Sequence, residues 1–84
     1  MTDTAPAPLA DTVAGLVASV LGLAPDAVDA ATRAADLDAW DSLGHVRIIL
    51  ALESRYGVAF SMEEIAAADS VARLADLVER ARAA

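Results

Sequence analysis

An apolar, helix-patterned segment begins abruptly in the middle of the chain, at Asp41-Ser42-Leu43, and this boundary constrains the fold more than any other feature. The stretch before it is rich in turn residues, whereas the residues after it repeat at α-helical spacing until Gly57. The boundary therefore predicts a helix from Ser42 to about Tyr56, with Ser42 exposed at its N-terminus. Asp41 is a residue type that commonly caps a helix.

The N-terminal half of the chain is typical of one helix followed by a long connection. Apolar residues recur at helical spacing over residues 8–21, and Gly22 followed by Pro25 ends the pattern. Residues 23–41 form a long connection for a compact domain, and residues 26–31 are the best candidate for a short helical turn within it. The apolar stripe of this first helix consists of Val13, Leu16, Val17, Val20 and Leu21.

The C-terminal third contains the signals for two more helices. In the capping box of residues 61–64, the Ser61 hydroxyl can accept from the Glu64 backbone N–H while the Glu64 side chain reaches back. This box predicts a short third helix ending near Ala68, and Ser70 then caps a fourth. We therefore expect an all-α four-helix bundle with a short third helix and a long loop between the first two helices. The fourth helix should bury Val71, Leu74, Ala75 and Val78, and its exposed acid–base pairs are Asp69 with Arg73 and Asp76 with Arg80.

Composition excludes several classes of protein. A chain of 84 residues buries only about 60% of its unfolded surface, which leaves little material for a water-excluding catalytic cleft. It contains no cysteine and no apolar run approaching the ~20 residues of a membrane span. Its net charge of -7 disfavours nucleic acid and favours basic surfaces on partners. We expect a soluble, cytoplasmic monomer that binds neither nucleic acid nor membranes.

The helix expected from Ser42 carries more apolar residues than one buried face can use. A helix in a small bundle buries a stripe of ~100° or slightly more, so some of these side chains must stay exposed. Exposed apolar residues grouped near one helix end indicate a docking surface. The apolar residues of this helix, of which only some can be buried, are Leu43, Val46, Ile48, Ile49, Leu50, Leu52 and Tyr56.

Ser42 admits three interpretations from its neighbours alone. An Asp-Ser pair before an apolar helix is most often only a cap. A serine at a helix N-terminus can also carry a phosphate ester, because the free N–H groups and the helix dipole stabilise an anion there. His45 would be the base of a serine hydrolase, but no group that orients its ring and no oxyanion hole can be identified. We interpret His45 as a polar neighbour of a group attached to Ser42.

Acidic and aromatic residues precede Ser42. Asp36, Asp38 and Asp41 lack the ligand spacing of a calcium loop, so they are more typical of a solvated acidic loop than of a metal site. Asp41 can either cap the helix or help to place a divalent metal while a group is transferred to Ser42. Trp40 is more typical of a loop anchor than of a platform for a ligand.

Five short segments stand in an order and spacing that are more specific than any one of them alone. They are Asp41-Ser42-Leu43, Ala51-Leu52-Glu53, Tyr56-Gly57-Val58-Ala59-Phe60, Glu63-Glu64-Ile65, and Ser70-Val71 leading into Leu74. Through them, over roughly residues 9–80, the chain resembles an acyl carrier protein of the phosphopantetheine-binding superfamily.

This resemblance implies a chemistry that the residues alone do not. In such proteins a phosphopantetheinyl transferase that uses magnesium attaches 4'-phosphopantetheine from coenzyme A to the motif serine, which Ser42 matches, with Asp41 beside it. The thiol of the arm holds an acyl or aminoacyl group as a thioester. The carrier catalyses nothing; a loading ligase or acyltransferase and downstream synthase enzymes act on the cargo. The residues that match the family's recognition surface are Leu43, Val46, Arg47 and Leu50.

The chain departs from the carriers of fatty acid biosynthesis. Their second helix is acidic, whereas Arg47 and Arg55 stand here with Glu53 as the lone acid, and Trp40 replaces a small residue. Trp-Asp-Ser-Leu is more similar to discrete carriers of polyketide and nonribosomal-peptide-like pathways. The expected organisation is a flexible tail over residues 1–7 and a single carrier domain over residues 8–82. The alternative function is an unmodified acidic helical module for protein–protein interaction.

Overall fold

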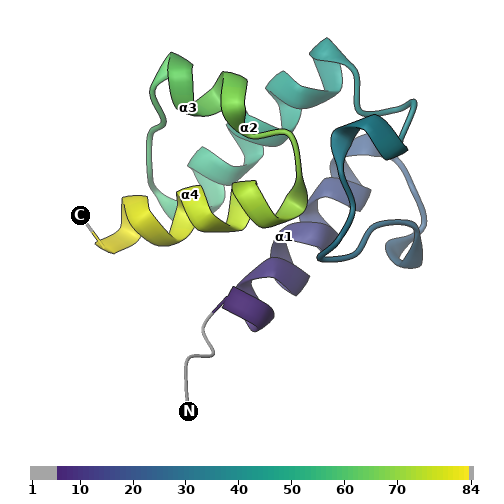
Figure 1. Cartoon of the computed structure of the whole chain (residues 1–84), viewed down its shortest axis with the longest axis horizontal. Coiled ribbons are helices and arrows are strands. Elements are labelled where there is room, and N and C mark those ends of the chain that lie inside the picture. Colours follow the sequence, from purple (N-terminus) through teal and green to yellow (C-terminus); the bar gives the residue numbers. More distant parts are fainter. Residues whose placement is uncertain (1–5, 84) are drawn as a thin grey trace.

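The computed structural model describes residues 6–83, and within them the fold is all-α, as the sequence predicts (Figure 1). Two short 3-10 turns lie in the long loop between the first two helices. No helix in this part of the chain is both long and apolar enough to cross a membrane. The elements are α1 (Pro6–Leu21), η1 (Pro25–Ala27), η2 (Ala34–Asp36), α2 (Ser42–Tyr56), α3 (Met62–Ala67) and α4 (Val71–Ala83).

Helix α1 begins at Pro6, two residues before the expected start. Prolines are tolerated in a first helical turn because the N–H groups there have no partner within the helix. Residues 6 and 7 belong to this helix, residues 1–5 lie outside the described part of the chain, and the division into a tail and a carrier domain stays a prediction. The end of α1 agrees with the sequence, because Gly22 follows it with the positive φ of 71° that terminates a helix.

The core lies where α1 packs against α2 and α4. Helix α1 buries three alanines beside its valines, which lets its backbone approach its neighbours closely, while Leu16, Val20 and Leu21 of the predicted stripe are only half-buried. Fully burying a Val, Leu or Ile side chain contributes about 1.5–3 kcal/mol, so a few large residues dominate this small core. Those buried almost completely are Val13, Val17, Ile48, Leu52, Val71, Leu74 and Val78.

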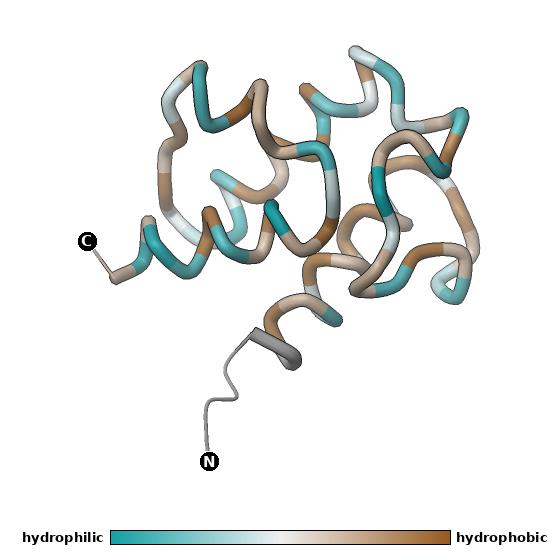
Figure 2. Tube along the Cα trace, viewed as in Figure 1, coloured by the Kyte–Doolittle hydropathy of each residue, from teal (hydrophilic) through white to brown (hydrophobic). Residues whose placement is uncertain are grey.

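Helix α4 shows the amphipathic pattern expected of it, with apolar and polar residues alternating turn by turn along the trace (Figure 2). The Ser70 hydroxyl accepts a hydrogen bond from the Arg73 backbone N–H at 3.1 Å, which confirms the predicted cap. Both predicted acid–base pairs are also present: Arg73 lies 3.7 Å from Asp69, and Arg80 lies 2.6 Å from Asp76.

The long loop is held to the start of α4. The Ala34 N–H donates to the Asp69 carbonyl at 2.8 Å, and the Val71 N–H donates to the Thr32 carbonyl at 3.0 Å. The turn predicted within residues 26–31 is present but starts one residue earlier and is shorter, because η1 covers Pro25–Ala27; η2 is a second turn that the sequence did not predict. Backbone pairing between segments this far apart in sequence leaves no local signal, so η2 could not be predicted.

Helix α3 is attached differently from the other three helices. None of its six residues is fully buried, and Ile65 is half-buried. The predicted capping box starts it, with the Glu64 N–H donating to the Ser61 hydroxyl at 3.1 Å and the Ser61 N–H donating to the Glu64 carboxylate at 2.8 Å. Hydrogen bonds, more than burial, therefore define this element.

Candidate functional site

Ser42 is the first residue of α2, and its side chain is exposed, as predicted. Asp41 caps the helix: one carboxylate oxygen, Oδ1, accepts from the Gly44 N–H at 2.8 Å. The His45 N–H donates to the Asp41 carbonyl at 2.8 Å, which starts the helical ladder. Within residues 6–83 the Ser42 hydroxyl and the N–H groups of Ser42 and Leu43 have no hydrogen-bond partner. A hydroxyl beside unpartnered helix N-terminal N–H groups suits attachment of an anion.

Gly44 lets this first turn pack closely against two other segments. A Cβ atom at this position would lie 2.7 Å from the Ala39 carbonyl oxygen and 2.8 Å from Cδ2 of Leu21. The turn that carries Ser42 is thus wedged between the preceding loop and the end of α1. The sequence analysis did not single out Gly44, because its neighbours come from elsewhere in the chain.

His45 does not lie free beside Ser42. Its ring Nδ1 accepts from the buried Trp40 indole Nε1–H at 3.0 Å, and its Nε2 lies 2.7 Å from the Ile65 carbonyl oxygen in α3. Both ring nitrogens are therefore engaged within the fold. These bonds leave neither nitrogen to act as a base for Ser42, and the interpretation of His45 as a polar neighbour of an attached group stays a prediction. Trp40 is 6% exposed, so it anchors the loop rather than forming an open platform.

The exposed face of α2 runs from Ser42 toward the middle of the helix. Three large apolar residues on it, Leu43, Val46 and Leu50, are 62%, 52% and 59% exposed. Arg47 is exposed among them and forms no ion pair with any residue in the described range. The expectation that α2 leaves apolar residues uncovered is confirmed.

Two of the acidic residues before Ser42, Asp36 and Asp41, accept hydrogen bonds from backbone N–H groups of the loop and of α2. The Asp36 carboxylate accepts from the Arg33 N–H at 2.9 Å, and Asp41 caps α2. Among residues 6–83 there is no group of three or more His, Asp or Glu side chains placed to hold a metal ion.

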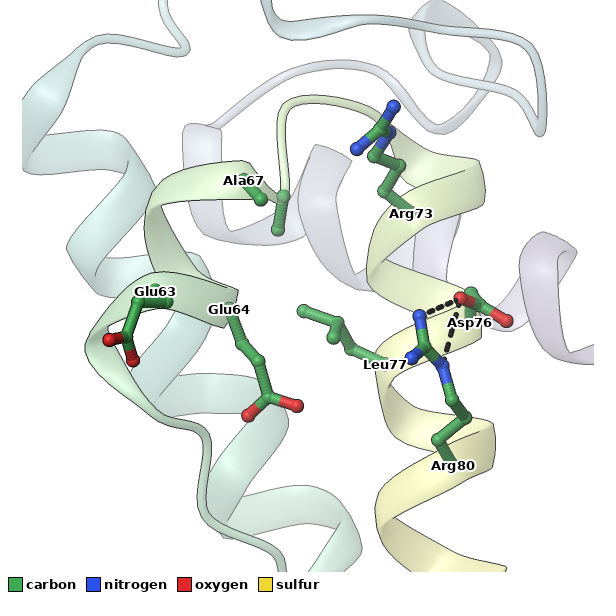
Figure 3. A pocket seen from close by; sticks show the side chains of 8 residues that line it. Glu63, Glu64, Ala67, Arg73, Asp76, Leu77 and Arg80 are labelled. Carbon is green, nitrogen blue, oxygen red and sulfur yellow. Dashed lines mark hydrogen bonds and ion pairs between the residues drawn. The ribbon is translucent and has the colours of Figure 1, made fainter.

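A cleft of about 410 Å³ lies between α3 and α4 (Figure 3). Both of its arginines are already paired, Arg73 with Asp69 just before α4 and Arg80 with Asp76 within it. Arg80 donates to Asp76 at 2.6 and 3.1 Å, and that hydrogen bond, with the charge of the carboxylate, raises the pKa of Arg80 above its usual value. The cleft does not include Ser42, because its lining consists of Glu63, Glu64, Ala67, Ala68, Arg73, Asp76, Leu77 and Arg80.

Residues 11–78, most of the chain, match the family model described as a phosphopantetheine attachment site. The chain belongs to the phosphopantetheine-binding family of carrier proteins. Its fold is similar to the solution NMR structure of a holo acyl carrier protein from Geobacter metallireducens, with a TM-score of 0.76 and 33% sequence identity over 90% of this chain and 87% of that one. No curated protein sequence matches the chain.

As an acyl carrier protein, the chain carries cargo on a 4'-phosphopantetheine prosthetic group and is not an enzyme. A phosphopantetheinyl transferase and acyl-handling enzymes are its partners in general terms. Family membership supports the carrier interpretation over an unmodified interaction module. The first turn of α2 fits such an arm, since it combines an exposed, unbonded hydroxyl with free N–H groups at the positive end of a helix.

Proposed function

We propose that Ser42 is the residue to which the 4'-phosphopantetheine arm of this carrier is attached. The observation that carries the proposal is an exposed hydroxyl, without a partner in the described residues, at the first position of a 15-residue helix. The free N–H groups of Ser42 and Leu43 would hold phosphate oxygens there. The Asp41 cap fixes the turn and leaves the second carboxylate oxygen, Oδ2, open to a cation.

The chain's own residues display the hydroxyl but do not activate it. When bound, the arm supplies the thiol that holds an acyl group as a thioester. His45, the nearest candidate base along α2, has both ring nitrogens engaged by Trp40 and Ile65. The transferase must therefore accept the Ser42 hydroxyl proton, and Asp41 is the acidic residue next to Ser42 that can help to place the magnesium ion.

Intact mass spectrometry tests the attachment site. The protein is incubated with coenzyme A, magnesium and a broad-specificity phosphopantetheinyl transferase. Wild type should gain the mass of one arm and Ser42→Ala should gain none. Ser54→Ala is the matched control, because Ser54 is another exposed serine on α2, and it should load like wild type. An arm on Ser42→Ala, or none on wild type, would overturn the assignment.

We further propose that partner enzymes dock on the face of α2 formed by Leu43, Val46, Arg47 and Leu50. At 100° per residue these positions and Ser42 share an arc of roughly 140°. The only exposed charge in this set is positive, and the lone acid of α2, Glu53, is half-buried and accepts from the Phe60 N–H at 3.0 Å. The matching partner surface is an apolar hollow with an acidic group at its edge.

Charge reversal tests this docking face. Arg47→Glu should raise the KM for the carrier about tenfold in loading assays, because the partner's acidic group would then meet a like charge. Arg55→Glu is the matched control: it makes the same change on α2 outside this face, at a residue whose guanidinium lies 5.8 Å from the Tyr56 ring centroid. The control should stay within about twofold of wild type, since distant surface charges are largely screened. If Arg47→Glu and Arg55→Glu changed the KM equally, the partner would respond to the net charge of the carrier, and the proposed docking face would be refuted.

Arg47 and Trp40 also favour a specialised pathway, of polyketide or nonribosomal-peptide type, over fatty acid synthesis. A loading ligase or acyltransferase and downstream synthase enzymes are the partners that this assignment implies. Loaded protein should be a poor substrate for acyltransferases of fatty acid synthesis, which dock on an acidic second helix. Transfer rates equal to those of a fatty-acid carrier in the same assay would contradict the assignment.

A further inference from the structure

Two side-chain hydrogen bonds each connect a residue before Ser42 to a residue after it. The Trp40 indole Nε1–H donates to Nδ1 of His45 at 3.0 Å, and Oδ1 of Asp41 accepts from the Gly44 N–H at 2.8 Å. Ser42 lies inside both of these closed loops of chain. The backbone at Ser42 is therefore restrained by the Trp40–His45 hydrogen bond as well as by the Asp41 cap.

The same histidine reaches a third segment. Nε2 of His45 lies 2.7 Å from the Ile65 carbonyl oxygen. This carbonyl belongs to the last turn of α3, where carbonyl groups have few partners within the helix. It also accepts from the Ala68 N–H at 3.3 Å. Helix α3 has six residues and buries none of them fully. A helix that short is not stable alone, so a bond from α2 contributes substantially to its position.

The chemistry of these groups allows a single arrangement of protons. An indole N–H can only donate and a carbonyl can only accept. The neutral His45 ring must therefore accept at Nδ1 and carry its proton on Nε2. We call this chain of two bonds, from Trp40 through His45 to Ile65, the Trp40–His45 relay.

We propose that Trp40 and His45 are positioning residues, and that the relay sets the orientation of Ser42 and holds α3 beside it. This inference rests on Ser42 being the attachment site. The relay lies on the inner side of the first turn, whereas the proposed docking residues Leu43 and Val46 point outward. Breaking the relay should therefore slow the transfer step more than it weakens docking, because small misplacements of a reacting atom are costly.

Three variants separate the bonds of the relay. Trp40→Phe removes the indole donor and keeps a smaller aromatic ring in the core. His45→Leu removes both bonds, and His45→Gln restores an acceptor and a donor on one side chain. The control is Val78→Ala, a truncation of a side chain buried in α4 that takes no part in the relay. Urea unfolding first gives the free energy of unfolding of each variant. The effects of the relay variants are then compared with those of Val78→Ala at a similar loss of stability.

The first measurement concerns the relay itself. Long-range ¹H–¹⁵N NMR spectra should show the Nε2–H tautomer of His45 in wild type, and Trp40→Phe should reduce its population. Amide exchange in α3 should accelerate about tenfold in His45→Leu, the effect of losing a hydrogen bond or two. Val78→Ala should leave the tautomer unchanged. A proton on Nδ1 of the wild-type ring would exclude the bond from Trp40 and so refute the proposed relay.

The second measurement concerns loading. In steady-state assays with coenzyme A, magnesium and a phosphopantetheinyl transferase, His45→Leu and Trp40→Phe should lower kcat about tenfold and leave KM within about twofold, with partial recovery in His45→Gln. Val78→Ala should load normally. If wild type takes up no arm, the proposed function fails, whereas the NMR result stands by itself. If His45→Leu and Trp40→Phe load at the same rate as wild type, the positioning role of the relay is refuted and the attachment of the arm to Ser42 is unaffected.

Discussion

Replacing Gly44 with alanine should destabilise the protein although alanine is the better helix former. The added Cβ would lie 2.7 Å from the Ala39 carbonyl oxygen and 2.8 Å from Cδ2 of Leu21. The leucine methyl can rotate away, but Ala39 presents a backbone atom next to the buried Trp40 anchor, so the first turn of α2 must shift. Such overpacking costs about 1–3 kcal/mol, whereas removing a helical glycine recovers at most ~1 kcal/mol. We expect a net loss of about 1–2 kcal/mol in the free energy of unfolding.

The same substitution at Gly15 provides a control of opposite sign. Gly15 lies on the exposed side of α1, and a Cβ atom there would meet nothing within 4 Å. Gly15→Ala should therefore raise the free energy of unfolding by about 0.5–1 kcal/mol through helix propensity alone. Because the two variants add the same methyl group to a helical glycine, their difference isolates the close packing at Gly44.

Urea unfolding followed by far-UV circular dichroism measures both changes. In a domain of this size 1 kcal/mol corresponds to a shift in Tm of about 4–8 °C, so Gly44→Ala should melt about 5–15 °C lower and Gly15→Ala about 2–8 °C higher. The same Cβ would lie 3.3 Å from Oδ1 of Asp41, so loading at Ser42 should also slow in Gly44→Ala. A gain of stability in both variants would show that Ala39 and Leu21 do not crowd the first turn of α2.

Two further predictions concern the ends of α2. Asp41→Ala should lower the free energy of unfolding by about 1 kcal/mol in urea titrations, whereas Asp41→Asn should stay within about 0.5 kcal/mol of wild type because asparagine caps equally well. Loading of Asp41→Asn should still slow, because the variant loses a carboxylate that can bind the transferase's magnesium. Unchanged loading would mean that Asp41 acts only as a cap. Gly57→Ala should cost about 1 kcal/mol in the same titrations, because Gly57 has φ 65° and a Cβ is disfavoured there, and a stability equal to wild type would contradict that conformation.

Signals that act over a few residues were sufficient to predict most of the helices. The start of α2 at Ser42 and its end before Gly57 follow from a cap and a left-handed glycine. The capping box of α3 and the Ser70 cap of α4 follow from the same local chemistry. The start of α1 at Pro6 lies two residues before the apolar pattern begins, because a first helical turn tolerates proline and needs no buried side chain.

The features that the sequence did not reveal all join segments that are distant in the chain. Gly44 is constrained by Leu21, and His45 is satisfied by Ile65, 20 residues later. Neither constraint leaves a periodicity, a cap or a breaker that could be read in advance. Both meet at the first turn of α2, where the end of α1, the long loop and α3 contact Gly44 and His45. The exposed Ser42 itself takes no part in these tertiary contacts, which are made by Gly44 and His45 beside it. The Asp41 cap fixes the same turn locally, so a test of the tertiary contacts is to substitute Gly44 and His45 while Asp41 is kept.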